Sequence, residues 1–169
     1  REPMGALLTD PPYHLRRYLC ALEGGEERHV LDHDVIWMQK LGEWYLKWLP
    51  LCQRLVWDRP AWFFVGWEWA PTFLRCLALT QWPVQDFWTG PREEVLVLAG
   101  HQPITPACAW IVRETVRKCW GLSRKPVPLL QTLLEVVPVR GPVLDPFAGD
   151  GSTLLAAKGL GLSAIGIEY

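Results

Sequence analysis

Two short motifs, each placed directly after an apolar run, constrain the fold of this chain most. Residues 5–8 (Gly-Ala-Leu-Leu) lead into Thr-Asp-Pro-Pro-Tyr at 9–13, and residues 142–144 (Pro-Val-Leu) lead into Asp-Pro-Phe-Ala-Gly-Asp-Gly-Ser at 145–152. Apolar runs of this kind are typical of buried parallel strands. Ligands of open α/β sheets bind at the carboxyl ends of the strands, near the switch in strand order. The two loops are therefore predicted to face one cleft.

The second motif contains the glycines of a ligand-binding turn. Gly149 and Gly151 permit a tight turn and a close approach of the backbone to a ligand, and Ser152 or Thr153 is expected to cap the helix that follows. Glu168 comes 19 residues after Gly149, at the end of the next predicted strand. A carboxylate at this spacing is suited to bind both hydroxyls of a ribose.

The same turn differs from a dinucleotide-binding turn. The position of the third glycine is occupied by Leu154, and the charges of Asp145 and Asp150 would repel a pyrophosphate. Both differences favour a ligand that has a ribose but no phosphates. The alternative is an ordinary strand-to-helix turn without a ligand.

The first motif suits chemistry on an exocyclic amine, a poor nucleophile because its lone pair is conjugated with an aromatic ring. The Asp10 carboxylate and the Pro11 carbonyl can accept both N–H hydrogens, held in place by the fixed φ of Pro11 and Pro12. Tyr13 offers a ring on which an extruded base can stack. Taken alone, the motif also fits a type I turn with proline at its second position.

Together these residues resemble the S-adenosylmethionine-dependent amino-group DNA methyltransferases, of the permuted kind in which D-P-P-Y precedes the D-P-F-x-G-x-G cofactor motif. Gly-Ile-Glu at 166–168 agrees with that family. The resemblance implies an α/β fold: a doubly wound, mostly parallel, Rossmann-like methyltransferase sheet with helices on both faces and a circularly permuted motif order. It implies methyl transfer to the amine of a flipped DNA base, with Asp10, Pro11, Pro12 and Tyr13 as catalytic residues. Adenine N6 is favoured over cytosine N4 because the motif begins with Asp rather than Ser.

The resemblance also implies a set of residues around S-adenosylmethionine. A family segment of the type H-P-T-Q-K-P closes over the methionine end of the cofactor, and residues 121–126 here read Gly-Leu-Ser-Arg-Lys-Pro. Its Lys-Pro is kept, whereas the His and the Pro after it are lost. The residues assigned to the cofactor are Asp145, Pro146, Phe147, Gly149, Gly151, Ser152, Glu168, Lys125 and Ser123.

DNA is the expected macromolecular partner, although the net charge of −1 gives no global sign of it. Arg113, Arg117 and Lys118 form a local basic cluster that is predicted to contact phosphates; a solvated helix face is the alternative. We expect a single domain over 1–169, with a catalytic half (1–100), a short DNA-contact region (101–125) and a cofactor-binding half (126–169). The middle region is too short for an independent recognition domain. A second copy of the chain or a partner subunit is therefore expected to supply target recognition, and a catalytically silent subunit of the same fold is the alternative function.

Other sequence features exclude further classes of function. The five cysteines form no C-x-x-C pair, which favours a reducing compartment and no structural zinc. His29 and His33 have no third ligand nearby, so no metal site is predicted. No run is long enough to span a bilayer. We expect a cytoplasmic protein, which the resemblance places in a bacterium or phage, in a restriction–modification setting.

The remaining sequence predicts alternating helices and strands. A helix is expected from the N-cap Asp34 to Pro50, with Trp37, Leu41, Trp44 and Trp48 on its core-facing side. Residues 14–33 are expected to form a loop. Strands are predicted at 61–66, 94–99, 142–144 and 163–167, and helices at 71–80, within 101–125, at 127–137 and at 153–158.

Overall fold

The structure, a computed structural model, describes residues 4–12, 31–90, 94–119 and 125–168. Its strands form one six-stranded sheet with the order β3-β4-β2-β1-β5-β6. The strands are β1 (Ala6–Thr9), β2 (Ala61–Gly66), β3 (Val84–Thr89), β4 (Glu94–Ala99), β5 (Val143–Asp145) and β6 (Ala164–Gly166). The helices are α2 (Leu31–Val56), α3 (Ala70–Leu79) after the short 3-10 turn Trp67–Trp69, α4 (Pro106–Cys119), α5 (Val127–Glu135) and α6 (Ser152–Gly159).

The sheet is mixed, and most of its strands share one direction. β1 pairs in parallel with both β2 and β5, and β5 pairs in parallel with β6. β4 pairs antiparallel with both of its neighbours, β2 and β3, so within the described sheet β4 alone runs against the rest. This reversal brings the first residue of β4 to the edge where the parallel strands end.

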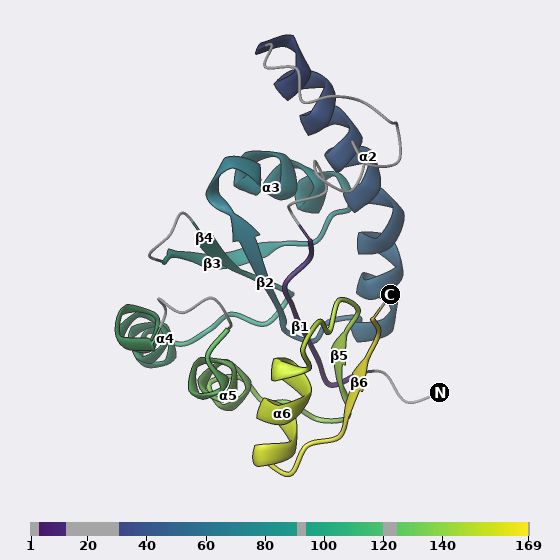
Figure 1. The fold of residues 1–169 in the computed structure, drawn as a ribbon. Helices are drawn as coiled ribbons and strands as arrows, with labels where there is room; N and C mark the ends of the chain where they lie inside the picture. The colour runs from purple at the N-terminus through teal and green to yellow at the C-terminus, as the bar shows by residue number, and fades with distance from the viewer. Residues whose placement is uncertain (1–3, 13–30, 91–93, 120–124, 169) are drawn as a thin grey trace.

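The order of the strands reverses between β1 and β5. From β5 the chain passes through α6 to β6 on one side, and from β1 it passes through α2 to β2 on the other (Figure 1). The two strands lie side by side, with Leu7 opposite Leu144. The loops after β1 and β5 therefore leave the sheet at its switch point, as the motif positions predicted.

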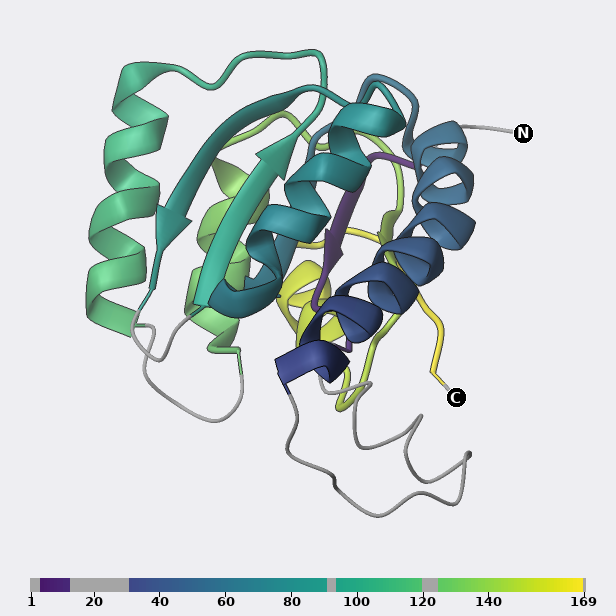
Figure 2. The same cartoon turned by 90° about the horizontal axis from the view of Figure 1, so that it is seen from above.

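Helices cover both faces of the sheet, which confirms the predicted class of fold (Figures 1 and 2). The alternation of side chains along each strand separates two cores. Leu7, Phe63 and Val97 pack with α2 and α3 on one face. Leu8 and Phe64 pack with α4, α5 and α6 on the other.

Two elements differ from the sequence prediction. α2 begins at Leu31, before Asp34, and continues past Pro50 to Val56. Proline removes one N–H donor from a helix, but the carbonyl of Leu46 that it leaves unpaired belongs to an exposed residue, where water can bind it. β3 was not predicted, because only Trp88 along it is buried and a bulge between Val84 and Asp86 breaks the alternation of an edge strand.

The aromatic stripe of α2 belongs to the core, as predicted. Leu41 is buried, and Trp44 and Trp48 pack half-buried against the same core. The side chain of Trp37 and the predicted loop at 14–33, apart from the start of α2, lie outside the described residues. Within the described part of the chain, no helix has the length and apolarity needed to cross a membrane.

Candidate active site

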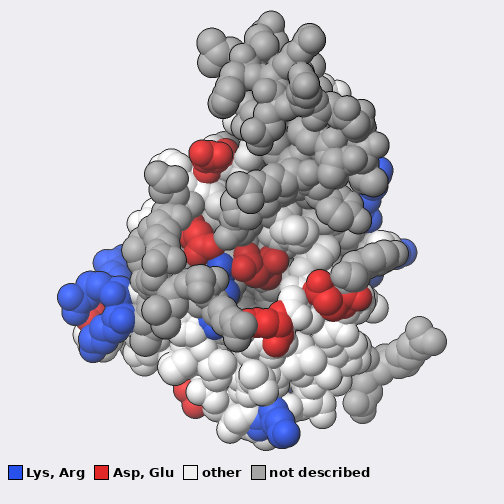
Figure 3. Space-filling model, in the orientation of Figure 1, with Lys and Arg blue, Asp and Glu red and all other residues white. Residues whose placement is uncertain are grey.

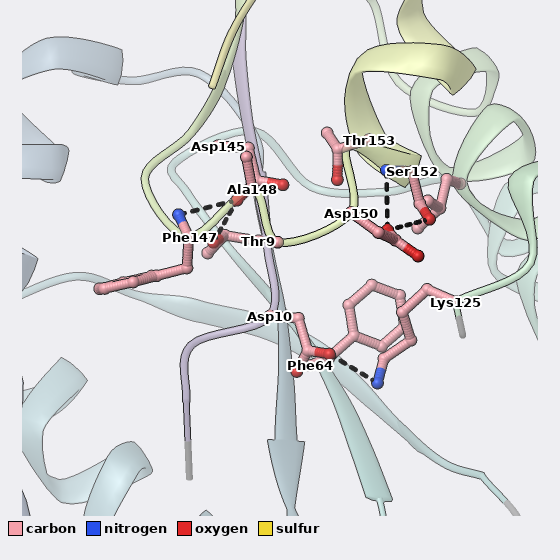
Figure 4. A pocket seen from close by; sticks show the side chains of 12 residues that line it. Thr9, Asp10, Phe64, Lys125, Asp145, Phe147, Ala148, Asp150, Ser152 and Thr153 are labelled. Carbon is pink, nitrogen blue, oxygen red and sulfur yellow. Dashed lines mark hydrogen bonds and ion pairs between the residues drawn. The ribbon is translucent and has the colours of Figure 1, made fainter. Parts of the chain in front are cut away.

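A cavity of about 230 Å³ lies where β1 and β5 end (Figure 4). Residues of both sequence motifs line it, so the two loops do share one cleft. They are joined by residues from β2 and from the start of α5. The lining consists of Thr9, Asp10, Phe64, Lys125, Leu130, Asp145, Phe147, Ala148, Gly149, Asp150, Ser152 and Thr153.

A buried hydrogen bond links the two motif loops. The Thr9 hydroxyl donates to Asp145 Oδ1 over 2.7 Å, and the Phe147 N–H donates to the same oxygen over 3.1 Å (Figure 4). The Thr153 side chain also hydrogen-bonds to Asp145. Burial raises the pKa of Asp145, and the hydrogen bonds from Thr153, Thr9 and Phe147 act against this rise. Asp145 therefore connects the end of β1 to the glycine turn.

We predict that Thr9→Val lowers the free energy of unfolding by about 1.5–3 kcal/mol, the range for a hydrogen bond to a charged group. Valine matches threonine in shape but leaves the buried Asp145 carboxylate with one donor fewer. Chemical denaturation at neutral pH measures the effect, and Thr9→Ser serves as the control that keeps the hydroxyl. An unchanged unfolding midpoint for Thr9→Val would show that this bond does not stabilise the fold.

The glycine turn presents open backbone to the cavity. Gly149 and Gly151 have φ values of +51° and +80°, and a Cβ added at either position would meet no atom within 4 Å. The expected capping by Ser152 or Thr153 is wrong. Gly151 occupies the N-cap position of α6, and Asp150 Oδ1 instead accepts hydrogen bonds from the Ser152 N–H (3.1 Å) and hydroxyl (2.6 Å).

Glu168 and Gly166 both contact the region of this turn. The Gly149 N–H donates to Glu168 Oε2 over 2.6 Å, so the carboxylate lies beside the glycines. A Cβ on Gly166 would lie 2.7 Å from Leu154 Cδ1 and 2.9 Å from Ala148 Cβ. Leu154 occupies the position of the third glycine in a dinucleotide-binding turn, and here the close approach of helix and strand depends on Gly166 instead.

The aromatic ring of the second motif is held by α2. The Phe147 ring centroid lies 5.4 Å from that of Trp44 and 5.1 Å from that of Trp48. Tilted and edge-on contacts at such distances are favourable aromatic geometries. The tryptophan stripe thus fixes the orientation of Phe147 at the wall of the cavity.

Asp10 lies at the centre of a charged cluster. The Lys125 ammonium is 2.8 Å from Asp10 Oδ2 and 2.7 Å from Glu94 Oε1, and it lies over the Phe64 ring, 5.0 Å from the centroid. Burial raises the pKa of Asp10 to about 6, although the charge of Lys125 and its hydrogen bond lower it. Asp10 Oδ1 is buried and accepts no hydrogen bond from the described residues. The structure therefore leaves one oxygen of this carboxylate without a hydrogen-bond donor among the described residues.

The other residues proposed from the sequence are placed as follows. Pro11 is buried beside Asp10, and Pro12 is exposed. Tyr13 and Ser123 lie outside the described residues. Arg113, Arg117 and Lys118 are exposed on α4 and do not line the cavity.

Charge is distributed unevenly over this face of the molecule. Figure 3 shows acidic side chains around its centre with basic ones between them, and a separate basic group over α4 at the left edge. Within that group Arg117 is bonded to Glu114 over 2.9 Å. Among the described residues, no group of His, Cys, Asp and Glu side chains is arranged to hold a metal ion.

Thr9, Phe64 and Glu94 are among the residues of the site that were not predicted from the sequence. Thr9 is the first residue of the first motif, but no local pattern indicates that its hydroxyl reaches Asp145. Phe64 and Glu94 lie in predicted strands and look like ordinary strand residues. Their proximity to Asp10 depends on the pairing of β2 with β1 and β4.

Part of this chain is similar in sequence to known DNA methylases. Residues 111–169 match the family model of N6 and N4 enzymes described as DNA methylase. A stretch of 52 residues is 46% identical to the type II methyltransferase M.HindIII of Haemophilus influenzae, covering 30% of this chain and 17% of that protein. The matched stretch thus covers less than a fifth of the length of that relative.

Solved structures of DNA methyltransferases share the fold over nearly the whole chain. The M1.HpyAVI complex with SAM matches with a TM-score of 0.57 and 21% identity, covering 98% of this chain and 83% of the other. A putative DNA modification methylase of Thermus thermophilus in complex with S-adenosyl-L-methionine gives 0.59 and 18%, with coverages of 99% and 82%. The cytosine-N4-specific PvuII DNA methyltransferase gives 0.62 and 12%, with coverages of 99% and 75%.

This chain therefore has the DNA methyltransferase fold. The resemblance to the amino-group DNA methyltransferases is confirmed, and its last third carries the sequence pattern of their family model.

Proposed function

We propose that this protein transfers a methyl group from S-adenosylmethionine to the exocyclic amine of a flipped DNA base. The observation that carries the proposal is the single cavity at which Asp10 of the first motif meets the glycine turn of the second. The similarity of residues 111–169 to the DNA methylase family supports the same activity.

The residues around the cavity fit this cofactor. S-adenosylmethionine supplies an activated methyl group on a positively charged sulfonium, and Asp145 and Asp150 give the cavity an acidic lining suited to a cation. The open backbone at Gly149 and Gly151 leaves room for close approach. In our assignment Asp145, Pro146, Phe147, Gly149, Gly151 and Ser152 line the cofactor, and Glu168 binds its ribose.

Asp10 and Pro11 bind the target amine in the proposed mechanism. Asp10 Oδ1 accepts one N–H, and the Pro11 carbonyl accepts the other, which draws the nitrogen lone pair out of conjugation with the ring. Pro12 stiffens this loop, and Tyr13 stacks on the flipped base. The methylated amine then releases a proton, which is accepted at the same end of β1.

Adenine N6 is the proposed target because the motif begins with Asp10. The similarity to a cytosine-N4-specific enzyme supports the amino-group chemistry without deciding between the two bases. Transfer of labelled methyl groups to duplexes built only of A·T pairs or only of G·C pairs tests this choice. Transfer to the G·C duplex alone would contradict it.

The same assay separates the enzyme from a catalytically silent subunit. Purified protein that binds S-adenosylmethionine and DNA but transfers no methyl group, and that stimulates a second methyltransferase, would support the silent subunit. The short 101–125 region still suggests a second copy or a partner subunit for target recognition. The permuted motif order remains part of this proposal.

We propose that DNA contacts the exposed basic side of α4. Arg113 and Arg117 lie near one another on the helix, with the exposed Trp110 one turn before Arg113. Lysine and arginine on such a helix can neutralise DNA phosphates. The acidic lining of the cavity would repel those phosphates. This placement leaves the cavity to the base and the cofactor.

Replacing Arg113, Arg117 and Lys118 with alanine is predicted to reduce the salt dependence of DNA binding. Each phosphate contact contributes about 0.9 to the slope of log affinity against log salt, so the slope should fall by up to about three units. A matched variant removes three exposed cations from α2 and α3 on the other face of the sheet, Lys47, Arg54 and Arg75. Equal slopes for the two triple variants would remove α4 from the DNA interface.

A further inference from the structure

Lys125 contacts the first motif more closely than its assignment to the cofactor implied. We propose that Lys125, anchored by Glu94, is a positioning residue that orients the Asp10 carboxylate toward the target amine and keeps it ionised. The inference rests on the proposed methyl transfer. It adds that Lys125 and Glu94 determine the orientation and charge of Asp10, the acceptor for the target amine in that reaction. Neither residue touches the reacting atoms in this proposal; both act through Asp10.

The two oxygens of Asp10 have different surroundings. Oδ2 is held by the Lys125 ammonium at 2.8 Å, whereas Oδ1 is buried and accepts no hydrogen bond from the described residues (Figure 4). Fixing one oxygen of a planar carboxylate fixes the direction of the other. A buried acceptor without a donor is unfavourable, and the N–H of an entering amine would satisfy it. The ion pair therefore engages Oδ2, and in this proposal the amine of the target base supplies the donor that Oδ1 lacks.

Glu94 holds Lys125 in this position. It is the first residue of β4 and pairs with Gly66 at the end of β2, so the reversed strand brings its carboxylate to the edge where β1 ends. Lys125 Nζ lies 2.7 Å from Glu94 Oε1, and each of the two side chains is 14% exposed. The Phe64 ring lies beneath the ammonium. Two carboxylates and one ring thus restrict a side chain that is otherwise flexible.

Lys125 also affects the protonation state of Asp10. Among the described residues, the titratable groups that face Asp10 are Lys125, Glu94 and Asp145, together with the phenol of Tyr45 on α2. Burial, Glu94 and Asp145 raise the pKa of Asp10, and Lys125 is the cation that lowers it. Without Lys125 the remaining influences all favour the protonated acid. A protonated Asp10 has no charge to strengthen its grip on the amine as positive charge develops on the nitrogen.

Lys125→Met and Glu94→Gln test the proposal because they shift the pKa of Asp10 in opposite directions. This pKa is measured in the ligand-free protein by carbon-13 NMR, with Asp10→Asn identifying the resonance. Lys125→Met should raise the pKa above about 6, and Glu94→Gln should lower it. General damage to the fold would not produce shifts of opposite sign.

Single-turnover methyl transfer across pH gives the second measurement. The ionised carboxylate is the required form, so the parental rate should fall as pH decreases through the Asp10 pKa of about 6. In Lys125→Met this limb should move to higher pH, with a rate loss of roughly tenfold on the acid limb for each unit of displacement. Lys125→Arg keeps the cation and should restore both the limb and the Asp10 pKa toward the parental values.

The results separate this inference from the function beneath it. An unchanged Asp10 pKa and pH profile in Lys125→Met would overturn the positioning role, as would weaker S-adenosylmethionine binding with an unchanged rate at saturation. If Lys125→Met does not fold, Glu94→Gln decides, and an Asp10 pKa that does not fall counts against the proposal. Parental protein that transfers no methyl group to DNA defeats the proposed function instead.

Discussion

Asp10→Ala is expected to lower the rate of methyl transfer to DNA by a factor of about 10²–10³, as for the loss of one preorganised partner of a transition state. The physical reason is that Oδ1 binds the amine most strongly when the nitrogen becomes tetrahedral and positive. An interaction made chiefly in the transition state changes the rate and leaves ground-state binding nearly intact. Rates measured with saturating DNA and cofactor report this effect.

Two further variants sharpen the test of Asp10. Asp10→Asn keeps an oxygen that can accept the N–H but removes the charge, so it isolates the electrostatic share of the effect. Asp58→Ala serves as the matched control, because Asp58 is half-exposed and precedes β2, at the opposite edge of the sheet. Calorimetry should show parental affinity for S-adenosylmethionine in all three variants. An Asp10→Ala protein that methylates DNA at the parental rate would contradict the catalytic assignment.

The second large effect is expected for Glu168→Ala, which should weaken binding of S-adenosylmethionine. Each hydrogen bond from a ribose hydroxyl to this carboxylate is worth about 1.5–3 kcal/mol, which corresponds to a loss of roughly 10- to 100-fold in affinity for one bond. Calorimetric titration of the cofactor measures it. The rate at saturating cofactor should change far less, because the ribose is distant from the reacting methyl group.

The structure requires a control for the contact between Glu168 and the glycine turn. Glu168 Oε2 accepts the Gly149 N–H, so truncation removes a bond within the protein as well as the proposed bond to the ribose. Glu168→Gln keeps an acceptor for Gly149 and should retain part of the affinity. Glu135→Ala, at the far end of α5 and exposed, tests for nonspecific loss of an acid. Equal affinities for Glu168→Ala and Glu135→Ala would rule out the ribose contact.

The contrast between Asp10 and Glu168 follows from their places in the fold. Asp10 extends β1 and faces the cavity beside Lys125, whereas Glu168 follows β6 and contacts the glycine turn. The Thr9–Asp145 bond joins the loops to which these two functions are assigned. The two loops are therefore joined by a buried hydrogen bond.

Much of this site could be predicted from the sequence because it depends on residues that are close to one another in the chain. Apolar runs defined β1, β2 and β4 and the region of β5, and the turn with positive φ at Gly149 and Gly151 follows from residues that favour such a backbone. The spacing of Glu168 from that turn is likewise a property of one strand–helix–strand unit. Short-range sterics and side-chain periodicity determine features of this kind.

Only the tertiary structure decided how distant segments meet. An apolar run such as 94–99 looks the same whichever way its strand runs, so the antiparallel pairing of β4 with β2 had no local signal. β3 is a largely exposed edge strand, and α2 continues through Pro50, where the carbonyl left unpaired belongs to the exposed residue Leu46. The ion pairs of Lys125 with Asp10 and Glu94 depend on that pairing and on the position of the segment that leads into α5. Long-range packing fixes such contacts, and no segment of the chain encodes them alone.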